Sequence, residues 1–331
     1  MKKELGIAIL LLVVCIVLSI CNPRFLTPFN LRNTGGLIGM YGIISIGMGL
    51  VIITRGIDLS VGSVFALEGV LLAIMLQEWH FVWPLACAIA IGLAMAIGWF
   101  HALLITRARL QPFIVTLCGF LIYRGLAMYI AHDESKGFGS QGYNFLRWVA
   151  NKTAWGFPIP FVVLIIVAVA TAVLLHKSVF GRHLYAVGHN EEAAIYSGIN
   201  SKRIITLAYV INGLLVGIAA IIFAFQMNTV APANHGLAFE MYAIAAAVLG
   251  GCSLWGGEGS ILGIVIGAAL LQVLQNLVNL LRIPTSLNLS VMGAVILAGV
   301  LADQFFSQRK RRIRAAVVEV QPGTTTTVNR A

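Results

Sequence analysis

The stretch KSVFGRHLYAVGHNEEAAIYSGINSKR, residues Lys177–Arg203, is a polar segment between two long apolar runs. It holds four Lys or Arg residues and two Glu residues. Asn190 is a favoured N-cap for a helix, and Gly198 is a favoured residue just beyond a helix end. Glu191 and Glu192 follow the cap and complement the positive helix N-terminus. We therefore predict a short helix here, and because isolated helices need about 12–15 residues, it needs a partner surface.

The composition around this segment indicates a membrane protein. Of 331 residues, 59% are hydrophobic and 10% are charged, whereas soluble domains average about 25% charged residues. The 34 glycines suit helices that pack closely in lipid. Five cysteines lie without the spacing of metal ligands, so we expect neither a metal site nor a cofactor.

The net charge of +10 raises the question of nucleic-acid binding. The basic residues are scattered at the ends of apolar runs, and no soluble segment is long enough to carry a basic patch. Contact with anionic membrane lipid explains this distribution, and we expect no nucleic-acid partner.

Ten apolar runs reach or approach the ~17–25 residues that cross a bilayer. We interpret the N-terminal run as an uncleaved first span, because no small-residue cleavage site follows it. The third and eighth runs are short, which makes them candidates for partial or broken spans. The predicted fold class is an all-α polytopic membrane protein with about ten transmembrane helices, at about 5–21, 34–53, 61–76, 81–105, 112–131, 159–176, 204–227, 237–251, 261–281 and 286–306.

The distribution of Lys and Arg predicts the orientation. With the N-terminus in the cytoplasm, fifteen of these residues fall on the cytoplasmic side and six outside, as the positive-inside rule requires. Both termini and the 177–203 loop are then cytoplasmic. A model with eight spans and two re-entrant segments also satisfies the rule. We expect one membrane domain, 1–306, and a basic, disordered cytoplasmic tail, 307–331.

The long external loop, 132–158, has two interpretations. Its tryptophans, Trp148 and Trp155, suit an interfacial cover in the aromatic belt. Its charged residues equally suit a docking face for an external partner.

Two Gly-rich polar segments interrupt the apolar runs: TRGIDLSVGS (Thr54–Ser63) and GGCSLWGGEGS (Gly250–Ser260). They resemble counterparts in two halves of the chain. Asp58 can accept a hydrogen bond from the amide of Ser60 or the next residue, and Glu258 can do the same for the ninth run. The segments are either tight turns at the membrane surface or broken helices beside a permeation path. Their motif glycines are Gly56, Gly62, Gly250, Gly251, Gly256 and Gly257.

Ionisable residues within spans usually face a cavity or a partner. Glu68 and Glu240 are the better candidates for a cavity. His101 fits a structural role, and Arg124 either serves a cavity or extends to the outer interface. Neutral amides also lie in the spans, where they can line a path for a polyol or hold helices together. The candidate path residues are Asp58, Ser60, Glu68, Asn212, Glu240, Gln275 and Asn276.

Motifs for catalysis are missing from the sequence. It has no GxxxxGK[ST] loop for ATP, no HExxH and no GxSxG. We therefore predict no catalytic residues. Any active transport by this chain draws its energy from another chain or from an ion gradient.

Four stretches together resemble the permease subunits of bacterial ATP-binding-cassette (ABC) sugar importers of the ribose, xylose and autoinducer-2 type. They are IITRGIDLSVGS (Ile52–Ser63), QPFIVTL (Gln111–Leu117), GRHLYAVGHNEEAAIYSGI (Gly181–Ile199) and AVLGGCSLWGGEGS (Ala247–Ser260). The resemblance runs from about residue 25 to 305. The chain has Arg55 and His189 where the family usually has Gly, which puts the local backbone geometry there in doubt.

The resemblance implies partners and a role for the polar loop. Two permease subunits, identical or paralogous, form the pore; two cytoplasmic ABC ATPase subunits drive it; a periplasmic or lipid-anchored sugar-binding protein delivers the solute. The chain is then a permease subunit in the bacterial plasma (inner) membrane and not an enzyme. The loop helix is the counterpart of the helix that couples to the ATPase, and its residues are Asn190, Glu191, Glu192, Ala193, Ala194 and Gly198.

Two alternatives remain at this point. One is a permease for branched-chain amino acids or another small solute. The other is a secondary transporter that uses an ion gradient, for which Glu68 and Glu240 are few buried carboxylates.

Overall fold

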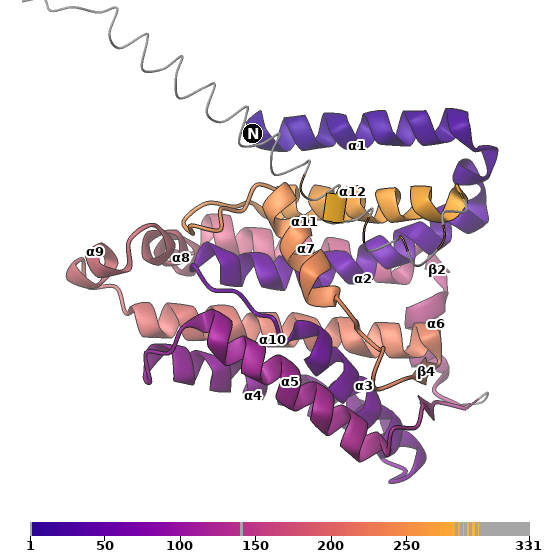
Figure 1. The fold of residues 1–331 in the computed structure, drawn as a ribbon, viewed down its shortest axis with the longest axis horizontal. Helices are drawn as coiled ribbons and strands as arrows, with labels where there is room; N and C mark the ends of the chain where they lie inside the picture. Colours follow the sequence, from indigo (N-terminus) through magenta and orange to yellow (C-terminus); the bar gives the residue numbers. More distant parts are fainter. Residues whose placement is uncertain are drawn as a thin grey trace, which may run out of the picture.

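The computed structural model describes residues 2–139 and 142–281, with single positions between 284 and 297. These residues form a helical bundle in which several long helices run along one axis and others cross it obliquely (Figure 1). Most of the predicted tenth span, 286–306, and all of the tail, 307–331, lie outside the described residues.

Seven helices of the described part are long and apolar enough to cross a membrane. This confirms an α-helical polytopic protein, while the count of ten spans is not established. Several helices begin where prolines fix the backbone, as at Pro28 and Pro112. The seven are α1 (Lys2–Cys21), α2 (Pro28–Ile53), α4 (Trp83–Thr106), α5 (Pro112–Ala131), α7 (Ile159–Lys177), α10 (Ser201–Met227) and α12 (Ile261–Leu280).

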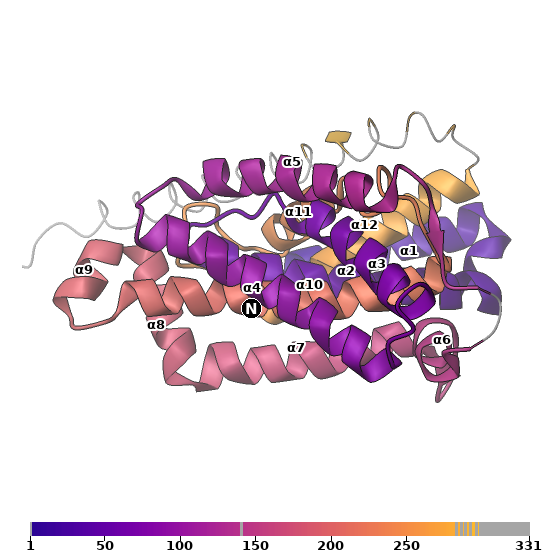
Figure 2. The same cartoon turned by 90° about the horizontal axis from the view of Figure 1, so that it is seen from below.

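The two ends of the bundle differ in structure. At one end, which we call the α9 end, lie α8 (Val179–His189) and α9 (Glu191–Tyr196) (Figures 1 and 2). The other, the α6 end, holds the short elements η1 (Pro23–Leu26), α6 (Asn144–Asn151), β1 (Lys136–Gly137), β2 (Thr153–Ala154), β3 (Phe157–Pro158) and β4 (Thr229–Val230). Strand β1 pairs antiparallel with β4, and β2 pairs antiparallel with β3.

Two apolar helices are too short for the class of full spans: α3 (Val61–Gln77) and α11 (Phe239–Leu249). At 1.5 Å per residue, α11 covers about 16 Å, roughly half of a ~30 Å bilayer core. Gln77, at the end of α3, donates to the Phe138 carbonyl at the α6 end (3.1 Å). The prediction that the third and eighth runs are short is confirmed.

Close packing of α4 against α10 depends on glycines. A Cβ on Gly98 would lie 2.3 Å from the Tyr209 carbonyl oxygen, and a Cβ on Gly213 would lie 2.3 Å from that of Ala94. No side chain fits at either position. The helices therefore approach backbone to backbone, as small residues permit in membrane bundles.

Candidate functional site

The Gly-rich segment after α2 turns back into the bundle. Asp58 is 5% exposed, and its Oδ1 accepts from the Ser60 amide (3.0 Å) and the Ser60 hydroxyl (2.6 Å). The expected bond from the Ser60 amide is thus present just before α3, whose N-cap residue is Ser60. The other oxygen, Oδ2, accepts from Asn212 Nδ2 (2.9 Å). Three of the predicted path residues therefore form one buried cluster from two elements.

The position of Asn212 along α10 shows how deep in the bundle this cluster lies. It lies eleven residues beyond Ser201, the start of α10, or about 17 Å along the helix axis. Segment 54–60 therefore runs from the α9 end into the interior, and α3 continues to the α6 end. The cavity beside Asp58 measures only about 10 Å³, about the room of one water molecule. The bundle is closed at this point.

The N-terminal ends of α3 and α11 meet in the interior. A Cβ on Gly62 would lie 2.2 Å from the Gly236 carbonyl oxygen and 2.4 Å from Glu240 Oε2. Glu240 is buried at the first turn of α11. The backbone between α10 and α11, residues 228–238, therefore re-enters the bundle opposite segment 54–60. The sequence pattern did not reveal this second re-entry, because the segment has no clear Gly-rich signature.

Arg124, on α5, joins the re-entrant segment 228–238 to the first turn of α3. Its Nη1 donates to the carbonyls of Pro232 (2.8 Å) and His235 (2.6 Å), and its Nη2 donates to the Gly62 carbonyl (3.0 Å). The Pro232 and His235 carbonyls lie outside any helix, so a charged fork of donors satisfies them. The alternative that Arg124 extends to the outer interface is wrong.

The other predicted residues do not join this cluster. Glu68 is 1% exposed, on α3. Asn276 exchanges hydrogen bonds with Asn30 (3.1 and 2.7 Å), which ties α12 to α2. Gln275 Oε1 is buried, with no hydrogen-bond partner among the described residues. His101 Nε2 lies 2.9 Å from the Tyr123 hydroxyl, which ties α4 to α5.

The polar loop forms two helices at the α9 end. The predicted helix is α9: Asn190 accepts from the Ala193 amide (3.0 Å) at its start, and Gly198 lies beyond its end with φ of 83°. Ala194 is buried, at 4% exposed, whereas Tyr196 is 91% exposed. Glu191, Glu192 and Ala193 are exposed on the same helix.

Helix α8 was not predicted, although two signals in the sequence favour it. Ser178 caps it by accepting from the Gly181 amide (3.3 Å). Leu184 and Val187 are spaced three apart and are both buried.

The second Gly-rich segment, 250–260, lies at the α9 end as a turn between α11 and α12. Its Gly257 amide donates to the Ile53 carbonyl (2.9 Å), and Tyr185 of α8 donates to the Gly259 carbonyl (2.6 Å). Burial raises the pKa of Tyr185 to about 12, so its hydroxyl keeps the proton it donates. The segment is thus a turn that connects α11 and α12, and the re-entrant backbone of the described residues lies at 54–60 and 228–238.

The motif glycines have two kinds of role. Gly251, Gly256 and Gly257 adopt positive φ, which glycine adopts without strain. The others leave no room for a side chain: a Cβ would lie 2.7 Å from the Tyr209 hydroxyl at Gly56, and 2.6 Å from Gly263 at Gly250.

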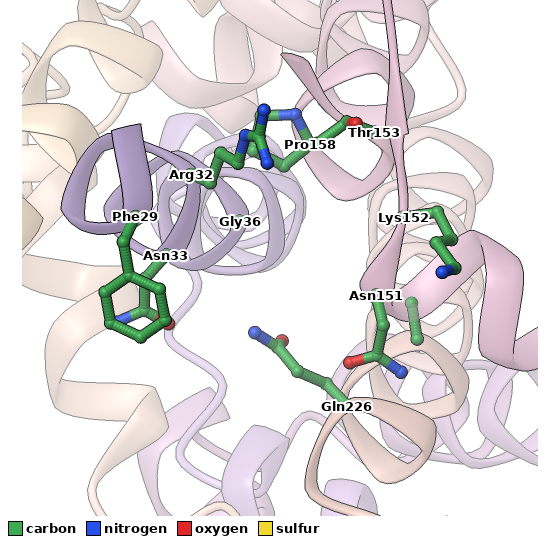
Figure 3. Close-up of a pocket in the computed structure, with 10 residues that line it drawn as sticks. Phe29, Arg32, Asn33, Gly36, Asn151, Lys152, Thr153, Pro158 and Gln226 are labelled. Atoms are coloured by element: carbon green, nitrogen blue, oxygen red, sulfur yellow. The ribbon is translucent and has the colours of Figure 1, made fainter. Parts of the chain in front are cut away.

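A cavity of about 550 Å³ opens at the α6 end. In Figure 3, Gln226 and Asn151 point into the space between the start of α2 and the segment around Lys152. Two cationic side chains and several amides face it. The sequence pattern did not predict this cavity, because its residues come from three distant segments: Phe29, Arg32, Asn33, Gly36, Ala150, Asn151, Lys152, Thr153, Pro158 and Gln226.

Sequence comparisons with known proteins show the family to which this chain belongs. Residues 30–300 match a protein family described as "Branched-chain amino acid transport system / permease component". The chain is 38% identical over 304 residues to a ribose import permease protein of Bacillus subtilis, covering 91% of this chain and 93% of the relative. It is 33% identical to a D-allose transport system permease protein of Escherichia coli, covering 91% of each. It is 35% identical to a fructose import permease protein of Bifidobacterium longum, covering 87% of this chain and 83% of the relative. No solved structure matches the chain.

Proposed function

The chain belongs to the family of branched-chain amino acid transport system permease components, and from this membership we propose that it is the membrane permease of an ABC importer for a monosaccharide or related small polyol. It is a multi-pass protein of the inner membrane and performs no catalysis. ATP hydrolysis takes place in a partner ATPase.

The observation that carries the proposal is similarity over nearly the whole chain to permeases named for ribose, allose and fructose. The family's own description favours a second candidate, import of branched-chain amino acids. Sugar is the better proposal, because the relatives named for sugars share 33–38% of aligned residues with this chain over about nine-tenths of its length.

In the proposed topology the α9 end faces the cytoplasm and the α6 end faces outward. The tally of basic residues supports this orientation, because it puts the N-terminus in the cytoplasm. The N-terminus lies at the α9 end, where Glu4 of α1 accepts a hydrogen bond from Ser260. The domain is residues 1–306, with a tenth span at 286–306. The tail, 307–331, is then cytoplasmic, like the N-terminus.

Helix α9 is the proposed contact with the ATPase. Its exposed residues, Ile195 (52%) and Tyr196 (91%), project beyond the bundle at the α9 end. A six-residue helix needs external support, and a groove in the ATPase would supply it. The proposed contact residues remain Asn190, Glu191, Glu192, Ala193, Ala194 and Gly198.

The proposed path runs past the buried cluster. Asp58, Ser60 and Asn212 offer acceptors and donors for hydroxyl groups, and Glu240 lies beside the meeting point of α3 and α11. Glu68 and Gln275 stay in the proposed set of path residues as buried polar groups. Asn276 also stays in the set, although its amide already bonds Asn30. The 550 Å³ cavity at the α6 end is the proposed entry, where a sugar-binding protein releases its solute. A second permease subunit completes the pore.

Reconstitution tests the proposal. The chain, its ATPase and its binding protein are placed in proteoliposomes with ATP at the ATPase side, and uptake of radiolabelled ribose, allose, fructose and leucine is measured. We expect ATP-dependent uptake of one of the sugars and none of leucine.

Two controls separate the alternatives. An ATPase that cannot hydrolyse ATP should abolish uptake, and dissipation of ion gradients by an ionophore should leave it unchanged. Leucine uptake would favour the amino-acid function, while uptake that needs an ion gradient and no ATP would refute an ABC permease.

A further inference from the structure

The end of α2 has an unusual residue at its turn. Arg55 has φ of 66°. Its amide donates to the Ile52 carbonyl (2.9 Å), and the Gly56 amide donates to the Val51 carbonyl (3.0 Å). This pair of bonds is the Schellman ending of a helix, in which the residue with positive φ is usually Gly. An arginine there carries backbone strain, which needs a compensating interaction.

The Arg55 side chain supplies that interaction at the junction of α8 and α9. Its guanidinium donates to the carbonyls of Gly188 (2.8 Å) and His189, the last two residues of α8, and to that of Trp255 (2.9 Å). Helix-terminal carbonyls lack partners within their own helix, and a cation beside them complements the negative end of the helix dipole. Arg55 thus joins α2, α8 and the 250–260 turn.

The junction that Arg55 holds is also the start of α9. Asn190, the N-cap of α9, directly follows His189. In the other direction, Asp58 is three residues beyond Arg55, at most about 10 Å along the chain, and its Oδ2 bonds Asn212 inside the bundle. The intervening Ile57 is anchored as well, because its carbonyl accepts from Thr116 (3.1 Å) and Tyr209 (3.3 Å).

We propose that Arg55 is a positioning residue that transmits displacement of α9 to the buried cluster of Asp58, Ser60 and Asn212. The proposal rests on the function above, in which α9 contacts an ATPase. When α9 moves, the carbonyls of residues 188 and 189 move with it. Their bonds to Arg55 then pull on the turn at the end of α2 and so on segment 56–60.

The substitution Arg55→Gly separates transmission from folding. Glycine adopts positive φ without strain and ends helices of this type well, so the fold should keep or gain thermal stability. The bonds to residues 188, 189 and 255 are lost. Arg109 gives a matched control, because it is an exposed arginine with φ of 54° in the turn between α4 and α5.

The experiment compares the wild-type complex with Arg55→Gly, Arg55→Lys and Arg109→Gly in proteoliposomes. Uptake of the sugar that the wild-type complex imports (ribose, allose or fructose) and ATP hydrolysis are measured together, with thermal unfolding of each complex. We expect Arg55→Gly to reduce solute imported per ATP at least fivefold, with an unchanged or higher melting temperature. Arg55→Lys should recover part of the ratio, since it restores one donor, and Arg109→Gly should match the wild type.

Hydrogen exchange gives a readout that does not depend on the solute. ATP binding to the wild-type complex should change exchange at residues 188–190 and 56–60 together. In Arg55→Gly the change at 188–190 should persist, and that at 56–60 should disappear.

Two results would overturn the proposal. One is a solute-to-ATP ratio for Arg55→Gly within twofold of the wild type, with exchange at 56–60 still responding to ATP. The other is separation of permease and ATPase in Arg55→Gly, which would make Arg55 a residue of assembly. Failure of the proposed function is distinguishable, because the wild-type complex itself would then show no ATP-dependent import.

Discussion

Asn212 contributes the bond that fixes Asp58 against α10. Replacement by Ala leaves Asp58 Oδ2 buried without its donor, and an unsatisfied buried group costs about 1–3 kcal/mol. We therefore predict that Asn212→Ala lowers the melting temperature of the purified permease and reduces ATP-dependent uptake severalfold. Thermal unfolding in detergent and transport in proteoliposomes measure the two effects.

Thr206→Ala serves as the control for this prediction. Thr206 also lies on α10, but its hydroxyl donates only to the Lys202 carbonyl one turn away (2.7 Å). It should leave both quantities close to those of the wild type. Equal behaviour of the two variants would show that the Asp58–Asn212 bond is dispensable.

Single residues were predictable only where their role is local. The bond from the Ser60 amide to Asp58 just before α3 and the Asn190 cap of α9 follow from residue types a few positions apart. Asn276 meets Asn30 from 246 positions away, and Arg124 bonds carbonyls more than 100 positions away. Such partners depend on how the helices are arranged in space, which the spacing of residues along the chain does not encode.

At the scale of elements, the contact of α3 with α11 depends on Gly62. A methyl group there would lie 2.2 Å from the Gly236 carbonyl oxygen, which is backbone and cannot rotate away. We predict that Gly62→Ala destabilises the permease by about 1–3 kcal/mol, as overpacking does, and abolishes uptake. Gly92→Ala is the matched control, because nothing lies within 4 Å of its Cβ position. The prediction fails if Gly62→Ala and Gly92→Ala have the same melting temperature and the same rate of uptake.

Helix α9 is expected to affect coupling without affecting the bundle. We predict that charge reversal at Glu191 and Glu192 lowers solute import per ATP severalfold, because both are exposed at the start of α9. Ala194→Trp should also lower this ratio, by displacing α9, because Ala194 is buried at 4% exposure and a larger side chain does not fit there. In the two glutamate variants, thermal unfolding of the transmembrane helices should stay unchanged, which circular dichroism measures. Full coupling in these variants would show that α9 is not the contact.

Helices were easier to predict than re-entrant backbone. Predicted runs at 112–131 and 261–281 agree with α5 and α12 within one residue, since length and hydropathy decide them. The re-entry at 228–238 was missed, and the 250–260 segment was left open between a tight turn and a broken helix. Glycine content marks a turn, whereas re-entry depends on partners such as Arg124, which supplies donors from another helix.

At the scale of the whole molecule, we propose that the two ends of the bundle face opposite sides of the membrane. Tyr196 at the α9 end is 91% exposed, and Trp155 at the α6 end is 90% exposed. In a background without the five native cysteines, we predict that a membrane-impermeant maleimide labels Trp155→Cys in intact spheroplasts. Tyr196→Cys should be labelled only after the membrane is permeabilised.

The same assay decides the number of crossings beyond the described residues. If 286–306 crosses the membrane from the α6 end, a cysteine replacing Thr325 in the tail must share the accessibility of Tyr196→Cys. If it shares that of Trp155→Cys, the tenth span is refuted while the orientation of the bundle still stands. If Tyr196→Cys is labelled in intact spheroplasts and Trp155→Cys only after permeabilisation, the orientation of the bundle is the reverse of the proposed one. That result would also remove α9 from the cytoplasm, where a coupling helix has to meet an ATPase.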